Sequence, residues 1–195
     1  MNENQTIFAN IRRHVDLSAE DEGALSAILM KRRVKKRQFI VQPGFVCAHQ
    51  SYVEKGAFRA YFIHKNGAEH TIQFAIEDWF ISDFNSYISQ TPASLFVEAL
   101  EDGLIMQMEY NAVEMLCAQN PIFERYFRMI AQKSFAFAQR RILSNLGQTA
   151  AERFRDFNKL YPEIVRRVPQ YMLASYLGMT PEFLSKTRKS LNRES

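Results

Sequence analysis

Residues 168–191, VPQYMLASYLGMTPEFLSKTRKSL, have the residue types and spacing of a helix-turn-helix that could bind DNA. Gly178 can adopt the left-handed backbone that a tight turn between two helices requires. After it, Thr180 can cap a second helix, and Pro181 and Glu182 suit the first turn of that helix. The segment therefore predicts two packed helices joined by a short turn.

The second helix carries polar and cationic side chains, as a helix that enters a DNA groove must. These residues are Ser185, Lys186, Arg188 and Lys189. Leu184 and Leu191 are expected to hold this helix on the first, and Thr187 stands where such motifs usually bury a branched apolar residue. An ordinary helical hairpin with a solvated basic face is the alternative. The joint placement of turn, cap and cations favours DNA binding.

The basic residues of the chain are concentrated around this motif. The chain has 195 residues, 47% of them hydrophobic, and a formal net charge of +4, which fits a globular protein. Residues 139–195 hold 11 Lys or Arg against 5 Asp or Glu, whereas residues 1–138 hold 14 against 16. Contacts with phosphate would need such a local excess of cations.

The elements that must position the motif begin with two short helices, expected over residues 5–14 and 18–30. Residues 31–108 then contain short runs of β-branched and aromatic residues separated by turn signals, which predict β-strands. Strands at this spacing indicate an antiparallel β-roll of the jelly-roll type. The chain as a whole is therefore expected to be an α+β protein.

The clearest hairpin is centred on Asn66-Gly67, a pair that predicts a two-residue type I′ turn. That register pairs Tyr61 with Ile72 and Ile63 with His70. It also predicts one mostly apolar face that is turned toward a core. The residues of this face are Tyr61, Ile63, Ile72 and Phe74.

A long helix is predicted from Pro121 to about Asn145. Its apolar residues recur at heptad-like spacing and are Phe123, Phe127, Ile130 and Phe137. The stripe could pack on its own β-roll or on a second copy. We favour a dimer through residues 121–145, because helix-turn-helix proteins read half-sites roughly 34 Å apart. Gly147 is the expected hinge between an effector domain, residues 1–145, and a DNA-binding domain, residues 146–195.

A β-roll, a long helix and a C-terminal helix-turn-helix in this order resemble the Crp/Fnr family, named for the cyclic-AMP receptor and the fumarate–nitrate regulator. EKGAFRAYFIHKNGAEHTIQFAIEDWFISDF resembles the central hairpin of its cyclic-nucleotide-binding-like domain, and residues 168–191 resemble its DNA-reading motif. The resemblance covers nearly the whole chain. It implies a homodimeric transcription regulator on palindromic double-stranded DNA, with RNA polymerase as a candidate partner. The family's C-terminal wing is expected to be missing.

By motif position, the resemblance assigns roles to six residues of the second helix and its cap. Base edges are assigned to Glu182, Ser185 and Lys186, and phosphates to Thr180, Arg188 and Lys189. Lys186 suits the O6 and N7 acceptors of guanine, and Glu182 suits the N4 donor of cytosine. Pro181 stands where the family often has Arg, so one guanine contact is expected to be absent.

Residues 80–100, FISDFNSYISQTPASLFVEAL, resemble the cyclic-nucleotide cassette of the family but depart from it. Ser82 stands for the Gly of the cassette, Asp83 for its Glu and Ala93 for its Arg, while Ser94 still matches. The missing Arg removes a charge-assisted contact with the cyclic phosphate, and an anion buried without a cation is penalised. We therefore expect cyclic AMP to bind weakly or not at all, and no other cofactor is indicated.

The candidate effector pocket comprises Tyr61, Ser82, Asp83 and Ser94. Four aromatic residues crowd the same region, namely Phe80, Phe84, Tyr87 and Phe96. They could line a pocket for an apolar or uncharged effector, or fill a core that holds no ligand. The second alternative is slightly favoured, because aromatic runs are more often core than pocket.

Two rival functions fit the sequence less well. A metal-dependent cupin-type enzyme needs converging His and carboxylate ligands, often in an HxH pair, and the four histidines form none. A signalling module that acts on protein partners would leave the basic C-terminal segment unexplained. We expect no catalysis and no metal; Cys47 and Cys117 suit apolar filler in a reducing compartment. Without a secretion signal or a membrane span, we expect a cytoplasmic protein.

Overall fold

The computed structural model describes the backbone of residues 4–194 and the side chains of residues 4–190. The chain begins with the helices α1 (Gln5–Arg12) and α2 (Ala19–Ile28), close to the predicted ranges. The Ser18 hydroxyl accepts a hydrogen bond from the Asp21 amide, and the Asp21 carboxylate accepts one from the Ser18 amide. This reciprocal cap fixes the start of α2.

The strands form two four-stranded antiparallel sheets, in the orders β1-β8-β3-β6 and β2-β7-β4-β5. Their bounds are β1 (Met30–Val34), β2 (Phe39–Val41), β3 (His49–Lys55), β4 (Phe58–Ile63), β5 (Glu69–Ala75), β6 (Phe80–Ile81), β7 (Phe96–Ala99) and β8 (Gly103–Glu109). A short helix, α3 (Phe84–Ser89), joins β6 to β7. The sheets enclose a core of fully buried side chains such as Val53, Phe58, Val97 and Ile105. The expected α+β architecture with a β-roll is confirmed.

The hairpin between β4 and β5 has a longer loop than the sequence predicts. Ile63 pairs with Glu69, not with His70, which shifts the register by one residue. A type I′ turn needs a positive φ at both central residues. Gly67 has φ of +85°, but the backbone of Asn66 stays at negative φ, and its side-chain oxygen accepts from the Ala68 amide at 3.0 Å. The two-residue turn was therefore a wrong prediction.

The predicted apolar face of this hairpin is only half correct. A bulge between Ala60 and Tyr61 interrupts the pairing of β4 with β5. Tyr61 and Phe74 are buried, whereas Ile63 and Ile72 are 47% and 39% exposed. A bulge adds one residue to one strand, so the alternation of faces that the sequence suggests does not continue across it.

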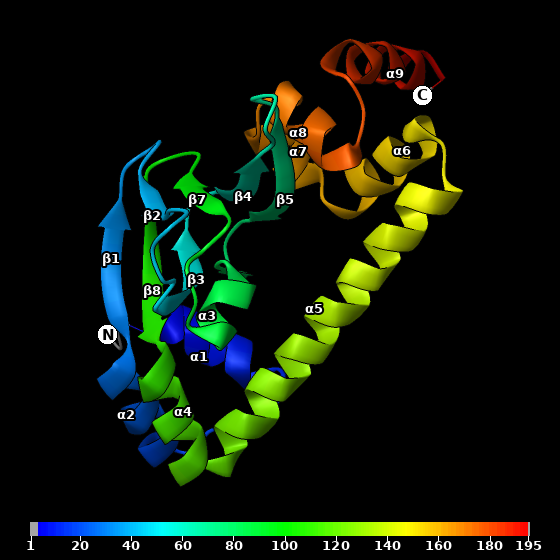
Figure 1. Ribbon diagram of the computed structural model, residues 1–195. Helices are drawn as coiled ribbons and strands as arrows, with labels where there is room; N and C mark the ends of the chain where they lie inside the picture. Colours follow the sequence, from blue (N-terminus) through cyan, green and yellow to red (C-terminus); the bar gives the residue numbers. More distant parts are fainter. Residues whose placement is uncertain (1–3, 195) are drawn as a thin grey trace.

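After α4 (Tyr110–Gln119), the long helix α5 (Pro121–Gly147) crosses the molecule from the β-roll to the C-terminal helices (Figure 1). These are α6 (Ala150–Leu160), α7 (Pro162–Arg167), α8 (Gln170–Leu177) and α9 (Pro181–Glu194). The predicted stripe on α5 packs against its own chain. Phe123 is fully buried, Phe127 and Ile130 border the same cluster beneath the β-roll, and the Phe137 ring lies 6.2 Å from that of Tyr161.

A different face of α5 is left uncovered in the single chain. Ala131, Phe135, Ala138 and Ile142 are spaced four, three and four residues apart, and all are exposed. Phe135 is 65% and Ile142 is 58% exposed. This spacing is that of a helix face that packs on another helix. We call these four residues the exposed stripe of α5.

Candidate DNA interface and effector region

The turn between α8 and α9 has the predicted geometry. Gly178 ends α8 in the left-handed region, with φ of 66° and ψ of 43°. The Thr180 hydroxyl accepts from the Phe183 amide at 3.2 Å and so caps α9. Leu184 is fully buried, and the buried Thr187 hydroxyl donates to the Phe183 carbonyl at 3.0 Å. Leu191, the second predicted anchor, lies outside the residues whose side chains are described.

The six predicted DNA contacts lie along and beside the outer face of α9. Thr180, Glu182, Lys186 and Lys189 are exposed, and Ser185 and Arg188 are half-buried. Figure 1 shows α9 at the opposite end of the molecule from α2, outside the β-roll. The polar residues of α9 are thus presented to solvent while Leu184 and Thr187 seat the helix on its neighbours.

The helix-turn-helix is attached to the β-roll through β5, the edge strand of its sheet. The Ser175 hydroxyl on α8 accepts from the Thr71 amide at 3.0 Å and donates to the Glu69 carbonyl at 2.8 Å. These two bonds satisfy backbone groups that an edge strand leaves unpaired. Next to them, the Phe74 ring lies 5.3 Å from the Tyr176 ring, within the core of the C-terminal helices. No spacing in the sequence signals these contacts.

A second attachment is an ion-pair cluster around Arg167 at the end of α7. Its guanidinium donates to both oxygens of Glu77, at 2.6 and 3.0 Å, and also contacts Glu101. The Gly56 amide donates to Glu77 at 2.8 Å. Burial alone would raise the pKa of Glu77, but these hydrogen bonds lower it to about 2.

This cluster predicts an acid-sensitive contribution to stability. Because the pKa of Glu77 is lowered on folding, its contribution is complete above its ordinary pKa of 4.5 and is lost as the pH falls toward about 2. Since the Glu77 side chain is 41% exposed, we expect at most about 1 kcal/mol. Urea unfolding of the wild type and Glu77→Gln should differ at pH 6 and converge toward pH 3. A difference that stays constant with pH would contradict this assignment.

Three of the four predicted effector-pocket residues lie together. The Asp83 carboxylate accepts from the Ser94 and Leu95 amides at 2.8 and 2.9 Å, from the Ser94 hydroxyl at 3.3 Å and from the Ser86 amide at 3.2 Å. Asp83 is only 2% exposed, and its neighbour Ser82 is also buried. The Asp83 carboxylate therefore already accepts the hydrogen bonds that the Ser94 and Leu95 amides of the cassette loop could give to a ligand.

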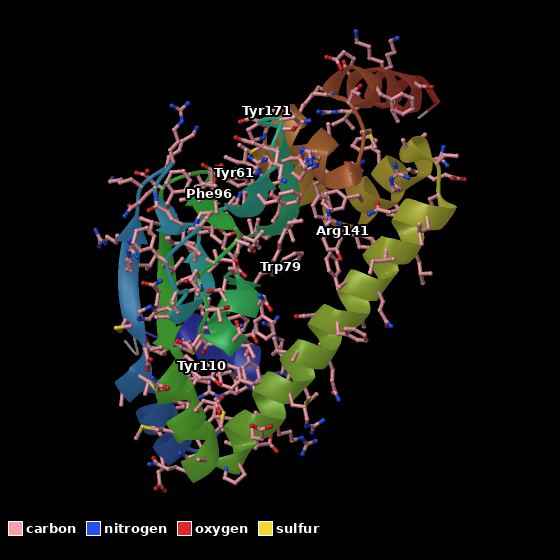
Figure 2. The ribbon with its side chains drawn as sticks, viewed as in Figure 1. Tyr61, Trp79, Phe96, Tyr110, Arg141 and Tyr171 are labelled. Atoms are coloured by element: carbon pink, nitrogen blue, oxygen red, sulfur yellow. The ribbon has the colours of Figure 1, made fainter. Side chains whose placement is uncertain are left out.

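Tyr61, the fourth predicted residue, is packed among other groups. Its ring stacks on Phe96 at 5.3 Å between centroids, and the Arg59 guanidinium lies 4.2 Å from its centre. Arg59 is 1% exposed and pairs with Glu69 at 2.7 Å. Figure 2 shows Tyr61 and Phe96 close together, with Tyr171 of α8 above them in this view. Burial raises the pKa of Tyr61 to about 12.

The four crowded aromatics are divided between core and surface. Tyr87 belongs to the core of the β-roll and Phe80 packs against Tyr52, whereas Phe84 is 50% exposed. Among the described residues, no group of three or more His, Cys, Asp or Glu is placed to hold a metal ion. Within the same part of the chain, no helix has the length and apolar character needed to cross a bilayer.

The β-roll corresponds to a known domain family. The family model described as "Cyclic nucleotide-binding domain" matches residues 31–120. The whole arrangement resembles FixK2 from Bradyrhizobium japonicum, with a TM-score of 0.71, 18% identity and 86% of each chain covered. The fold is that of the Crp/Fnr regulators.

Two further solved structures share this Crp/Fnr fold. A transcriptional regulator assigned to the crp/fnr family from Eubacterium rectale has a TM-score of 0.70 and 17% identity, over 92% of this chain and 85% of that one. The Catabolite Activator Protein of Thermus thermophilus has a TM-score of 0.56 and 18% identity, over 91% and 85%. No curated protein sequence matches the chain.

Proposed function

We propose that this protein is a homodimeric transcription regulator that binds palindromic DNA through α9. The observation that carries the proposal is the orientation of α9. Its buried residues, Leu184 and Thr187, seat it on the helix-turn-helix, while Lys186 and its polar neighbours face solvent. A helix held in this way can present its first turns to the major groove. The Crp/Fnr fold of the whole chain supports the same function.

The exposed stripe of α5 supplies the dimer contact in this proposal. It lies on a different face of the helix from Phe123, which packs into its own chain. A second copy laid against Phe135 and Ile142 would remove from water two of the large apolar side chains that a single chain leaves exposed. Two copies of α9 would then read two half-sites.

We further propose that the regulator acts without cyclic AMP. Ala93 stands where the cassette would place its phosphate-binding Arg, and Asp83 already takes the Ser94 and Leu95 amides. A cyclic phosphate would have to displace this carboxylate, and it would meet a like charge instead of a cation.

Selection of genomic DNA fragments by the purified protein tests the function directly. We expect enriched fragments to share a sequence with twofold symmetry, and their affinity to fall steeply with salt, because phosphate contacts release counterions. Enrichment without a shared sequence would contradict a sequence-specific regulator. Twofold symmetry would also report the geometry of the dimer.

The role of Lys186 can be separated from that of Lys189 on the selected site. Lys186→Ala should cost about 1–3 kcal/mol on the preferred site and relax the preference at one base pair, because it removes a base contact. Lys189→Ala is the matched control and should weaken all sequences alike while reducing the salt dependence. An unchanged base preference in Lys186→Ala, measured by competition titration, would remove Lys186 from the base-reading residues.

A further inference from the structure

A hollow of about 440 Å³ lies where α5, α6 and α8 meet. This volume is within the usual range of small-molecule sites. Phe137 and Arg141 line it from α5, Phe157 and Leu160 from α6, and Tyr176 from α8. None of the four residues of the exposed stripe lines this hollow.

Arg141 in this hollow is a largely buried cation held by neutral groups. Its guanidinium donates to the carbonyls of Thr71 at 3.0 Å, Tyr176 at 3.2 Å and Ile72. It also lies 4.1 Å from the centre of the Tyr176 ring, and Figure 2 shows it between α5 and the C-terminal helices. Its buried Nε has no hydrogen-bond partner, and no ion pair joins Arg141 to a carboxylate among the described side chains. Its charge is therefore left without a counterion.

The remaining charged groups around the hollow add to this positive excess. Arg140 and Arg153 also line it, and the Arg153 guanidinium donates to the carbonyls of Leu177 and Gln148 at 2.9 and 2.6 Å. Asp156 is the one carboxylate among the described lining residues, and its oxygen accepts from the Gln148 amide group at 2.7 Å. Three arginines and one aspartate thus line the hollow, and most of the lining surface is apolar.

We propose that this hollow binds a small organic anion, with its charged group near Arg141 and its apolar body on the side chains of Phe157 and Leu160. A carboxylate would supply the missing counterion and accept charge-assisted hydrogen bonds. The ligand would contact both α5 and α8, so its occupancy would bias how the helix-turn-helix sits relative to the long helix. That consequence rests on the proposed DNA-binding function; the binding itself does not.

The test uses the full chain without DNA and a panel of aromatic and aliphatic carboxylates of about six to twelve carbons, each paired with its neutral primary amide. Binding is measured by isothermal titration calorimetry and by protein NMR shifts. We expect at least one acid to bind saturably and about tenfold more tightly than its amide. The absence of binding across the panel, or equal binding of acid and amide, would overturn the proposal.

A matched pair of substitutions places the ligand in the hollow. Leu160→Glu puts a negative charge on its rim, and Asn158→Glu puts the same charge elsewhere on α6; both side chains are exposed, so folding should be preserved. We expect Leu160→Glu to weaken binding of the acid about tenfold and Asn158→Glu to change it little. Equal effects of the two variants would show that the anion binds elsewhere. Failure of DNA selection, in contrast, would leave this result unaffected.

Discussion

If two copies pair along the exposed stripe of α5 as proposed, replacing both Phe135 and Ile142 with Glu is expected to leave the protein monomeric and to weaken its binding to a palindromic site by at least about 100-fold. In the single chain these side chains are 65% and 58% exposed. Two copies packed along the exposed stripe would bury four new carboxylates with no partner. Burying an unpaired carboxylate costs several kcal/mol, so four of them strongly oppose the proposed helix pair. A monomer would engage only one half-site at a time.

Sedimentation velocity and DNA titration of the same samples measure the two effects. Met115→Glu is the control, because Met115 is a 62% exposed apolar residue on α4, away from the stripe. It should remain dimeric and bind DNA as the wild type does. Circular dichroism should show the double variant to be folded, since both substituted side chains already face solvent. A double variant that stays dimeric would exclude this face of α5 as the interface.

The apolar residues of α5 illustrate what periodicity in a sequence can and cannot predict. The spacing of Phe123, Phe127, Ile130 and Phe137 correctly predicts a helix, but every one of these residues packs against its own chain. Sequence alone cannot say which apolar face meets the β-roll and which is left for a partner. That depends on the direction in which α5 runs from its first residue, Pro121. The residues now proposed for the dimer include two alanines, which carry little hydrophobic signal.

The helix-turn-helix was predictable because its determinants are local. The left-handed turn at Gly178 and the cap at Thr180 depend on residues within a few positions of each other. The register of the β4–β5 hairpin also depends on a short segment. There, however, the Asn66 side-chain oxygen accepts a hydrogen bond from the Ala68 amide, and the backbone of Asn66 does not adopt the positive φ that the predicted turn requires. The two-residue rule fails there because the observed loop is longer and leaves Asn66 at negative φ, which a type I′ turn does not allow.

No pattern in the sequence predicts the contacts between the C-terminal helices, α5 and the β-roll. Arg141, Arg167 and Ser175 find their partners about 35 to 106 residues away in the sequence. Each is an ordinary polar residue on a helix. Its partner becomes visible only when the C-terminal helices are seen packed against the β-roll and α5. The candidate hollow next to Arg141 was therefore invisible in the sequence, whereas the changes in the nucleotide cassette could be read directly from Asp83 and Ala93.

Replacing Asp83 with Ala is expected to lower the free energy of unfolding by about 3 kcal/mol, because buried donors then lose their acceptor. The Asp83 carboxylate receives four hydrogen bonds, from Ser86, Ser94 and Leu95. Asp83→Asn keeps one acceptor oxygen and the side-chain volume, so it should lower the free energy of unfolding by less. Urea unfolding at neutral pH measures both variants.

The Asp83 carboxylate also competes with a phosphate for the amides of the cassette loop. If the Asp83 carboxylate fills that place, cyclic AMP should leave the melting temperature of the wild type unchanged even at millimolar concentration, since a ligand stabilises only the state that it binds. Asp83→Ala should remain equally unresponsive, because Ala93 still supplies no cation for the phosphate. A rise in melting temperature with cyclic AMP in the wild type would show that the folded protein binds the nucleotide, and it would contradict the proposal that the regulator acts without cyclic AMP.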